Sequence, residues 1–149
     1  MKNPRYRVND YVRIKVDGES KVGRIVGVVD NGSFNEYEVK WWVKLDDSAE
    51  WNAEFSAASF TEVSPIDLNA SLIRSLGFKK TESGTYRCET DNRHIVVMDW
   101  ADNSVVVYRH GNKIVRDYFY ADFLSDLQHL FEDIDAEFPD LDIYFALQK

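Results

Sequence analysis

Short stretches of alternating apolar and polar residues constrain the fold of this 149-residue chain more than any other feature. Val12, Ile14 and Val16 alternate with polar residues and precede Asp17-Gly18, a pair that favours a turn. Similar stretches recur along the chain, each bounded by Gly, Asn or Asp. A period of two places every second side chain on the same face of a strand. We therefore expect a protein built mainly from antiparallel β-strands.

Residues 1–64 are predicted to form an all-β module. Strands are expected over 8–16, 22–29 and 37–42, with a shorter one near 51–55 and a closing segment at 60–63. Glycines inside the second stretch indicate tight bending or a β-bulge. A small barrel needs short, strongly bent strands in order to close. Ser64-Pro65 is the expected boundary, since proline cannot donate to a strand ladder.

Four stretches of this module resemble the strands of SH3-like barrels of the Tudor/KOW kind. They are YRVNDYVRI (6–14), GRIVGV (23–28), YEVKW (37–41) and FSAASFTEV (55–63). The resemblance implies a five-stranded SH3-like β-barrel. It implies no particular function, because such barrels serve many unrelated functions.

Residues 65–149 are predicted to form an α+β module. A short helix over 69–76, capped by Asp67 or Asn69, should stop at Gly77. Four strands follow at 85–89, 94–100, 104–109 and 113–120, with connections short enough for antiparallel hairpins. A last helix over 120–134 is expected from apolar residues at three- and four-residue spacing: Tyr120, Phe123, Leu124, Leu127, Leu130, Phe131 and Ile134. The apolar tail after Pro139 should pack as a strand or short helix.

The predicted fold class is therefore mainly β, or α+β: a small SH3-like barrel followed by a helix, a four-stranded antiparallel meander and a helix. The stretches LIRSLGF (72–78) and YADFLSDLQHLF (120–131) of the second module resemble small proteins of bacterial prophages and mobile elements, especially in Bacteroidetes. This resemblance implies a genomic context and no activity.

No residue pattern of a catalytic or metal site is found in the sequence. Cys88, His94, His110 and His129 lie too far apart for zinc-ligand spacing. The stretch after Asp133 begins like a calcium loop, but Phe138 stands where that loop requires glycine. Nucleophile elbows, phosphate-binding loops and dinucleotide fingerprints are also missing from the sequence. We expect no catalytic residue, no metal and no cofactor, and so a binding protein rather than an enzyme.

The sequence indicates a cytoplasmic protein without a membrane segment. Cys88 is the single cysteine and has no partner for an internal disulfide, which fits a reducing compartment. The charged first residues lack the apolar run of a secretory signal. No stretch reaches the length and apolar content of a membrane-spanning helix.

Charge is unevenly distributed along the chain, whose net charge is −8. Residues 1–45 carry nine Lys/Arg and six Asp/Glu, whereas residues 117–142 carry nine Asp/Glu and no Lys or Arg. Asp126, Glu132 and Asp133 would give the last helix a negative face. This face either serves solubility or docks a basic partner, for instance by imitating nucleic-acid phosphates. The leading hypothesis is a non-enzymatic interaction or regulatory protein of a prophage or mobile element, whose protein partner is not identified.

The alternative hypothesis is a nucleic-acid-associated module that binds through the barrel. Adjacent Trp41 and Trp42 must point to opposite faces of their strand, so that one of them is at least partly exposed. Trp42, Trp51 and Tyr37, with Arg24 nearby, could then stack on bases or surround a cation. Equally, these rings could fill a small core.

Overall fold

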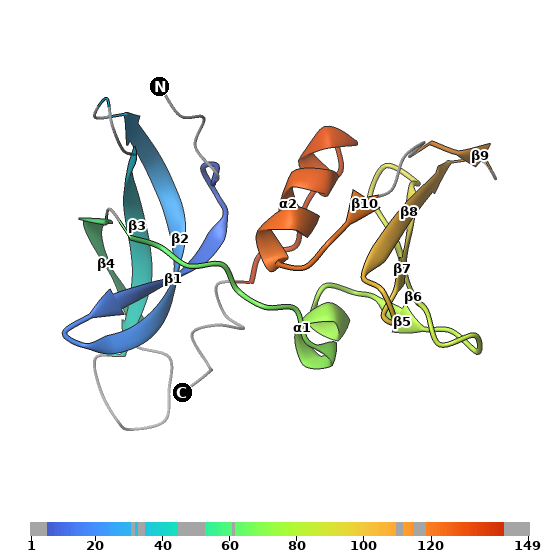
Figure 1. The fold of residues 1–149 in the computed structure, drawn as a ribbon, viewed down its shortest axis with the longest axis horizontal. Helices are drawn as coiled ribbons and strands as arrows, with labels where there is room; N and C mark the ends of the chain where they lie inside the picture. Colours follow the sequence, from blue (N-terminus) through green and yellow to red (C-terminus); the bar gives the residue numbers. More distant parts are fainter. Residues whose placement is uncertain are drawn as a thin grey trace. The chain divides into compact units, whose positions relative to one another are not determined.

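A computed structural model describes residues 6–30, 32, 35–44, 53–60, 62–109, 112–114 and 119–141, without the side chains of 42–44 and 53–57. The described chain consists mainly of antiparallel strands with two helices (Figure 1), which confirms the predicted β-rich, α+β class. The described residues divide into two compact units, one of residues up to Ile66 and one spanning Asp67–Leu141.

The first unit contains one antiparallel sheet of four strands in the order β1-β2-β3-β4. The strands are β1 (Tyr11–Val16), β2 (Glu19–Asp30), β3 (Asn35–Lys44) and β4 (Ala53–Phe60). Asp17 and Gly18 join β1 to β2 with φ angles of 52° and 82°. Two successive positive φ angles are typical of the tight hairpin turn that an Asp-Gly pair favours.

The described residues of this unit do not form the closed five-stranded barrel that the SH3-like resemblance implies. Beyond the four strands, a single antiparallel bridge joins Arg13 of β1 to Ser64. Its two backbone hydrogen bonds measure 2.8 Å and 2.9 Å.

The core of the first unit lies on one face of this sheet. Buried members of its apolar cluster are Tyr6, Val12, Ile14, Ile25, Tyr37, Val39 and Trp41. Tyr6 and Tyr37 meet edge to face with ring centroids 5.6 Å apart. Close packing of β2 on β3 requires Gly23, because a Cβ there would clash with Val39 and stand 2.9 Å from the Lys40 carbonyl oxygen. Gly23 thus permits close approach of two strands. The register between β2 and β3 shifts between Ile25 and Gly27, as the alternative of a bulge in this stretch predicts.

The second unit combines two helices with a second antiparallel sheet. Its sheet has the order β10-β8-β7-β6-β5, and β9 also pairs with β8. The elements are α1 (Ala70–Ser75), β5 (Lys79–Lys80), β6 (Tyr86–Glu89), β7 (Ile95–Asp99), β8 (Ser104–Arg109), β9 (Asn112–Lys113), β10 (Phe119–Tyr120) and α2 (Leu124–Asp133).

Helix α1 begins and ends at residues that the sequence predicts. The Asn69 side chain accepts a hydrogen bond of 2.9 Å from the Leu72 N–H. At the other end Gly77 has a φ of 94°, and the N–H groups of Gly77 and Phe78 donate to the carbonyls of Arg74 and Ile73. These paired bonds form the Schellman motif, in which glycine takes the left-handed position.

Two predictions for the second unit need correction. In place of one strand over 113–120, the described residues form the short strands β9 and β10, while β5 was not predicted. Helix α2 begins at Leu124 rather than near Tyr120, because Tyr120 pairs with Ser104 in the sheet. The apolar tail lies outside the described residues from 142 onward.

The sheet of the second unit has one buried and one open face. In β6, β7 and β8 buried residues alternate with more exposed ones, and the buried set is Tyr86, Cys88, Val96, Met98, Val105 and Val107. Both helices lie on the same side of this sheet (Figure 1). Ser125 and Gln128, polar residues of α2 outside its apolar pattern, are buried as well. The polar surface of α2 is therefore narrower than the sequence pattern indicates.

Candidate functional site

The structure does not bring the predicted binding residues of the first unit together. Tyr37 is only 6% exposed and packs in the core. Arg24 pairs in register with Lys40, next to core residue Val39, so that Arg24 and Tyr37 lie on opposite faces of the sheet. Trp51 and the side chain of Trp42 lie outside the described residues.

Asp126, the first predicted docking residue of α2, is part of the helix start. Its Oδ2 atom accepts hydrogen bonds from the backbone N–H groups of Asp122, at 3.1 Å, and Phe123, at 3.0 Å. Phe123 is the N-cap residue and has no side-chain acceptor of its own. The carboxylate of Asp126 therefore satisfies backbone donors at the positive end of the helix dipole.

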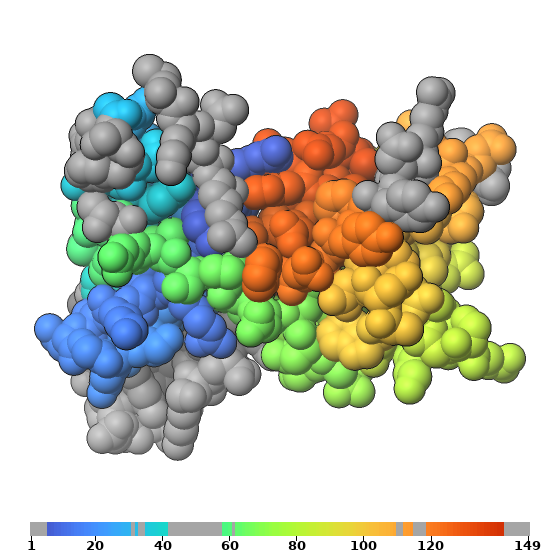
Figure 2. Space-filling model, viewed as in Figure 1, coloured from blue at the N-terminus to red at the C-terminus, as the bar shows by residue number. Residues whose placement is uncertain are grey.

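The other two predicted docking residues, Glu132 and Asp133, are exposed in the last turn of α2. Further exposed carboxylates follow them in the chain or lie in the turn that is hydrogen-bonded to this segment. We call the whole set the acidic end of α2: Asp91, Glu132, Asp133, Asp135, Glu137 and Asp140. The orange-to-red part of the chain, which includes α2, is visible on the face drawn in Figure 2.

Hydrogen bonds join the two segments that form the acidic end of α2. The Asn92 side-chain amide donates to the Ile134 carbonyl over 2.8 Å. The Glu137 N–H donates to the Asp91 carboxylate over 2.9 Å. Residues more than 40 positions apart in sequence are thereby held side by side. Arg93 is a basic residue that is exposed at the same turn.

The placement of these acids opposes the stability of α2. Carbonyl groups at a helix C-terminus carry partial negative charge, which disfavours nearby carboxylates and favours cations. The last turn of α2 holds no basic residue. Asp135 also occupies the left-handed C′ position with a φ of 55°, where glycine is usual.

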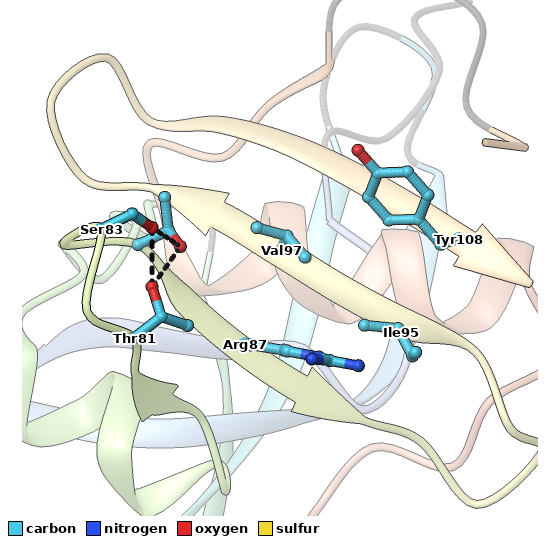
Figure 3. A pocket seen from close by; sticks show the side chains of 7 residues that line it. Thr81, Ser83, Arg87, Ile95, Val97 and Tyr108 are labelled. Atoms are coloured by element: carbon cyan, nitrogen blue, oxygen red, sulfur yellow. Dashed lines mark hydrogen bonds between the residues drawn. The ribbon is translucent and has the colours of Figure 1, made fainter. Parts of the chain in front are cut away.

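A second feature of the same unit is a groove on the open face of its sheet (Figure 3). Its volume is about 350 Å³, and it is lined by Thr81, Ser83, Thr85, Arg87, Ile95, Val97 and Tyr108. Arg87 lies opposite Val97, and Ile95 lies opposite Tyr108, in the strand register. The sequence analysis missed this groove. Its signal is the run Ile95 to Met98, which is apolar on both faces of β7.

Three hydroxyl groups meet at one end of the groove (Figure 3). Thr81 Oγ1 lies 2.9 Å from Ser83 Oγ and 2.8 Å from Thr85 Oγ1, while the remaining pair is 3.3 Å apart. Each hydroxyl can rotate to donate or accept. Together they form a polar group that can adapt to a ligand.

Within the described residues, no group of His, Cys, Asp and Glu side chains is arranged to hold a metal ion. Cys88 is buried, and this burial, with a smaller effect of the Glu89 carboxylate, raises the pKa of its thiol. A raised pKa leaves less of the nucleophilic thiolate. In the described part of the chain, no helix has the length and apolar character to cross a membrane.

Comparison with models of protein families, with curated proteins and with solved structures finds no match to this chain. The functional interpretation accordingly rests on the residues and geometry described above.

Proposed function

We propose that this is a non-enzymatic interaction protein that docks a positively charged protein partner through the acidic end of α2. The observation that carries the proposal is that the turn with Asp91 is hydrogen-bonded to the C-terminal end of α2 and the segment after it, which together carry five further exposed carboxylates. Two hydrogen bonds hold these segments together, at a helix end where negative charge lowers stability. A regulatory role in a prophage or mobile element follows only from the sequence resemblance.

The partner surface should carry clustered Lys or Arg side chains. Complementary charge of this kind accelerates encounter and selects the partner more than it adds affinity. Because exposed charges are screened by salt, binding should weaken as ionic strength rises. Asp126 is excluded from the docking set because it lies at the opposite end of α2, where its carboxylate accepts the backbone N–H groups of the helix start.

Nucleic-acid binding by the first unit, the alternative from the sequence, has less support. Tyr37 lies in the core, where its ring is not available to stack on a base. Arg24 lies on the opposite face of the sheet from Tyr37. The two therefore cannot act on one ligand without rearrangement of the sheet.

The test is capture of partners by the tagged full-length protein, with and without nuclease, using two variants of equal charge. The docking variant neutralises four acids of the acidic end: Glu132→Gln, Asp133→Asn, Asp135→Asn and Glu137→Gln. The control variant neutralises four exposed acids elsewhere: Glu19→Gln, Glu38→Gln, Glu62→Gln and Glu82→Gln.

We expect a nuclease-resistant protein partner that the wild type and the control variant retain and the docking variant loses. High salt should release the same partner. Retention of the partner by a folded docking variant would contradict the proposal. Loss of all partners on nuclease treatment would instead support the nucleic-acid alternative.

A further inference from the structure

The open face of the second sheet carries an apolar strip where polar residues are expected. Sheets with one face on the core usually carry polar side chains on the other face. Here Ile95 and Val97 point outward from β7, and Val106 and Tyr108 from β8, all four partly exposed. The strip lies wholly within the second unit and supplies an apolar floor for the groove.

Basic side chains flank this strip although the chain as a whole is acidic. Arg87 lies directly across from Val97, Lys79 lies across from Arg87, and Lys113 lies across from Tyr108. Residues that face one another across the strands form two rows here, Lys79-Arg87-Val97-Val106 and Glu89-Ile95-Tyr108-Lys113. Glu89 is the one acid in these two rows. Within the described part of the chain, no carboxylate pairs with the Arg87 guanidinium. The groove thus offers a cation next to an apolar surface.

The ligand's shape follows from the layout of the groove. The Arg87 side chain extends along the sheet so that its guanidinium lies beside Ile95, while Val97 occupies the centre and the three hydroxyls the opposite end (Figure 3). Neighbouring strands lie about 4.8 Å apart, and alternate side chains of an extended peptide are about 6.8 Å apart. Ile95 and Val97 are themselves alternate residues of β7, so two alternate side chains of such a peptide match the positions of the guanidinium and the centre.

From this arrangement we propose that the groove binds an extended peptide segment with an acidic side chain two residues from an apolar one. The carboxylate pairs with Arg87, and the apolar side chain packs on Val97 against the Tyr108 ring. Backbone groups of the peptide hydrogen-bond to the hydroxyls of Thr81, Ser83 and Thr85. The site takes an anionic segment, whereas the acidic end of α2 takes a cationic surface. The proposal therefore does not depend on the proposed function.

The test is a fluorescence-polarisation titration of the full-length protein with a library of dye-labelled heptapeptides. Every member carries Glu or Asp two positions from Leu, Ile or Phe, and the remaining positions are randomised with uncharged residues. Matched libraries replace the acid by Gln or by Lys. Selection of the best binders from the first library then provides a single probe for variants of the protein.

We expect the wild type to bind the acidic library saturably. Binding of the wild type to the Gln library, and of Arg87→Gln to the acidic library, should be weaker by about tenfold or more, since a charge-assisted hydrogen bond is lost in each case. Arg87→Glu should switch the preference to the Lys library. The matched control Lys80→Gln removes an exposed charge of the same sign, on a residue outside the groove lining, and should leave binding unchanged.

Absence of saturable binding up to about 1 mM peptide would overturn the proposal. So would equal affinity of the wild type and a folded Arg87→Gln variant for the selected probe. If a free small carboxylate, such as 4-methylpentanoate, binds as tightly as the selected peptide, the groove is a small-molecule site and the peptide proposal is overturned. The docking variant of the acidic end should bind the peptide normally, which separates a failure here from a failure of the proposed function.

Discussion

Asp126 is expected to stabilise α2 rather than to take part in docking, and a substitution can test this. In Asp126→Ala the N–H groups of Asp122 and Phe123 lose their shared acceptor, Oδ2 of residue 126. The negative charge at the positive end of the helix dipole is lost as well. We therefore expect this substitution to destabilise the second unit, although Asp126 looks like a surface acid in the sequence.

The expected size of the effect follows from the environment of the two hydrogen bonds. One is exposed and the other is partly buried, which places each at the low end of the range for charged acceptors. Loss of a helix-start cap costs about 0.5–2 kcal/mol, and loss of the dipole interaction about 0.3–1 kcal/mol. Together these losses lower the free energy of unfolding by about 2 kcal/mol.

Urea denaturation followed by circular dichroism would measure this change. Thermal unfolding should shift down by about 4–8 °C if the whole chain unfolds together, and by about twice that if the second unit unfolds alone. Asp126→Asn keeps an oxygen acceptor and should lose about half as much stability. The matched control Asp133→Asn removes a charge at the opposite end of α2 and should stabilise slightly. If Asp126→Ala leaves stability unchanged while Asp133→Asn lowers it, the assignment of roles in α2 is wrong.

Two further predictions concern Asp135 and Cys88. Asp135→Gly removes a charge from the negative end of α2 and a side chain from a residue with a φ of 55°. The free energy of unfolding should therefore rise by about 1 kcal/mol, while capture of the basic partner weakens. A lower free energy of unfolding in urea titrations would refute this prediction. Burial raises the pKa of the Cys88 thiol above its ordinary value of 9.0, so the native state favours the protonated form. Stability should therefore decline as pH rises above about 9, where the unfolded chain ionises first, and Cys88→Ala should flatten that decline. If urea titrations show that the free energy of unfolding falls equally from pH 8 to 10 in the wild type and in Cys88→Ala, this prediction is wrong.

Local sequence signals predicted the turns and the first helix well. The Asp17-Gly18 turn, the Asn69 cap and the stop at Gly77 depend on the conformational preferences of a few neighbouring residues. Such preferences act within one turn of chain, so that a single sequence can reveal them.

Features that depend on distant residues were less predictable. The start of α2 was misplaced because Tyr120 pairs with Ser104, a contact that helical periodicity does not reveal. Burial of Ser125 and Gln128 likewise depends on tertiary packing. The SH3-like barrel stays an expectation from resemblance, since the described residues of the first unit form four strands and one further bridge, that between Arg13 and Ser64.

The candidate site was predicted only in part. Glu132 and Asp133 are exposed as expected, but the contribution of Asp91 requires the turn before β7 to meet the end of α2. The role of Asp126 had a visible signal, an acid three residues after the N-cap position. Charge counting alone gave every acid of the segment the same role.

The order of strands in the second unit has a consequence for how the chain reaches this structure. Successive strands β5 to β8 are also neighbours in the sheet, so each pairing closes only a short loop. Loops of this size cost little chain entropy, which favours rapid formation of the hairpins one after another. The hydrogen bond from Asn92 to the Ile134 carbonyl joins residues 42 positions apart and needs α2 in place. We therefore expect the acidic end to assemble last, on a sheet that has already formed.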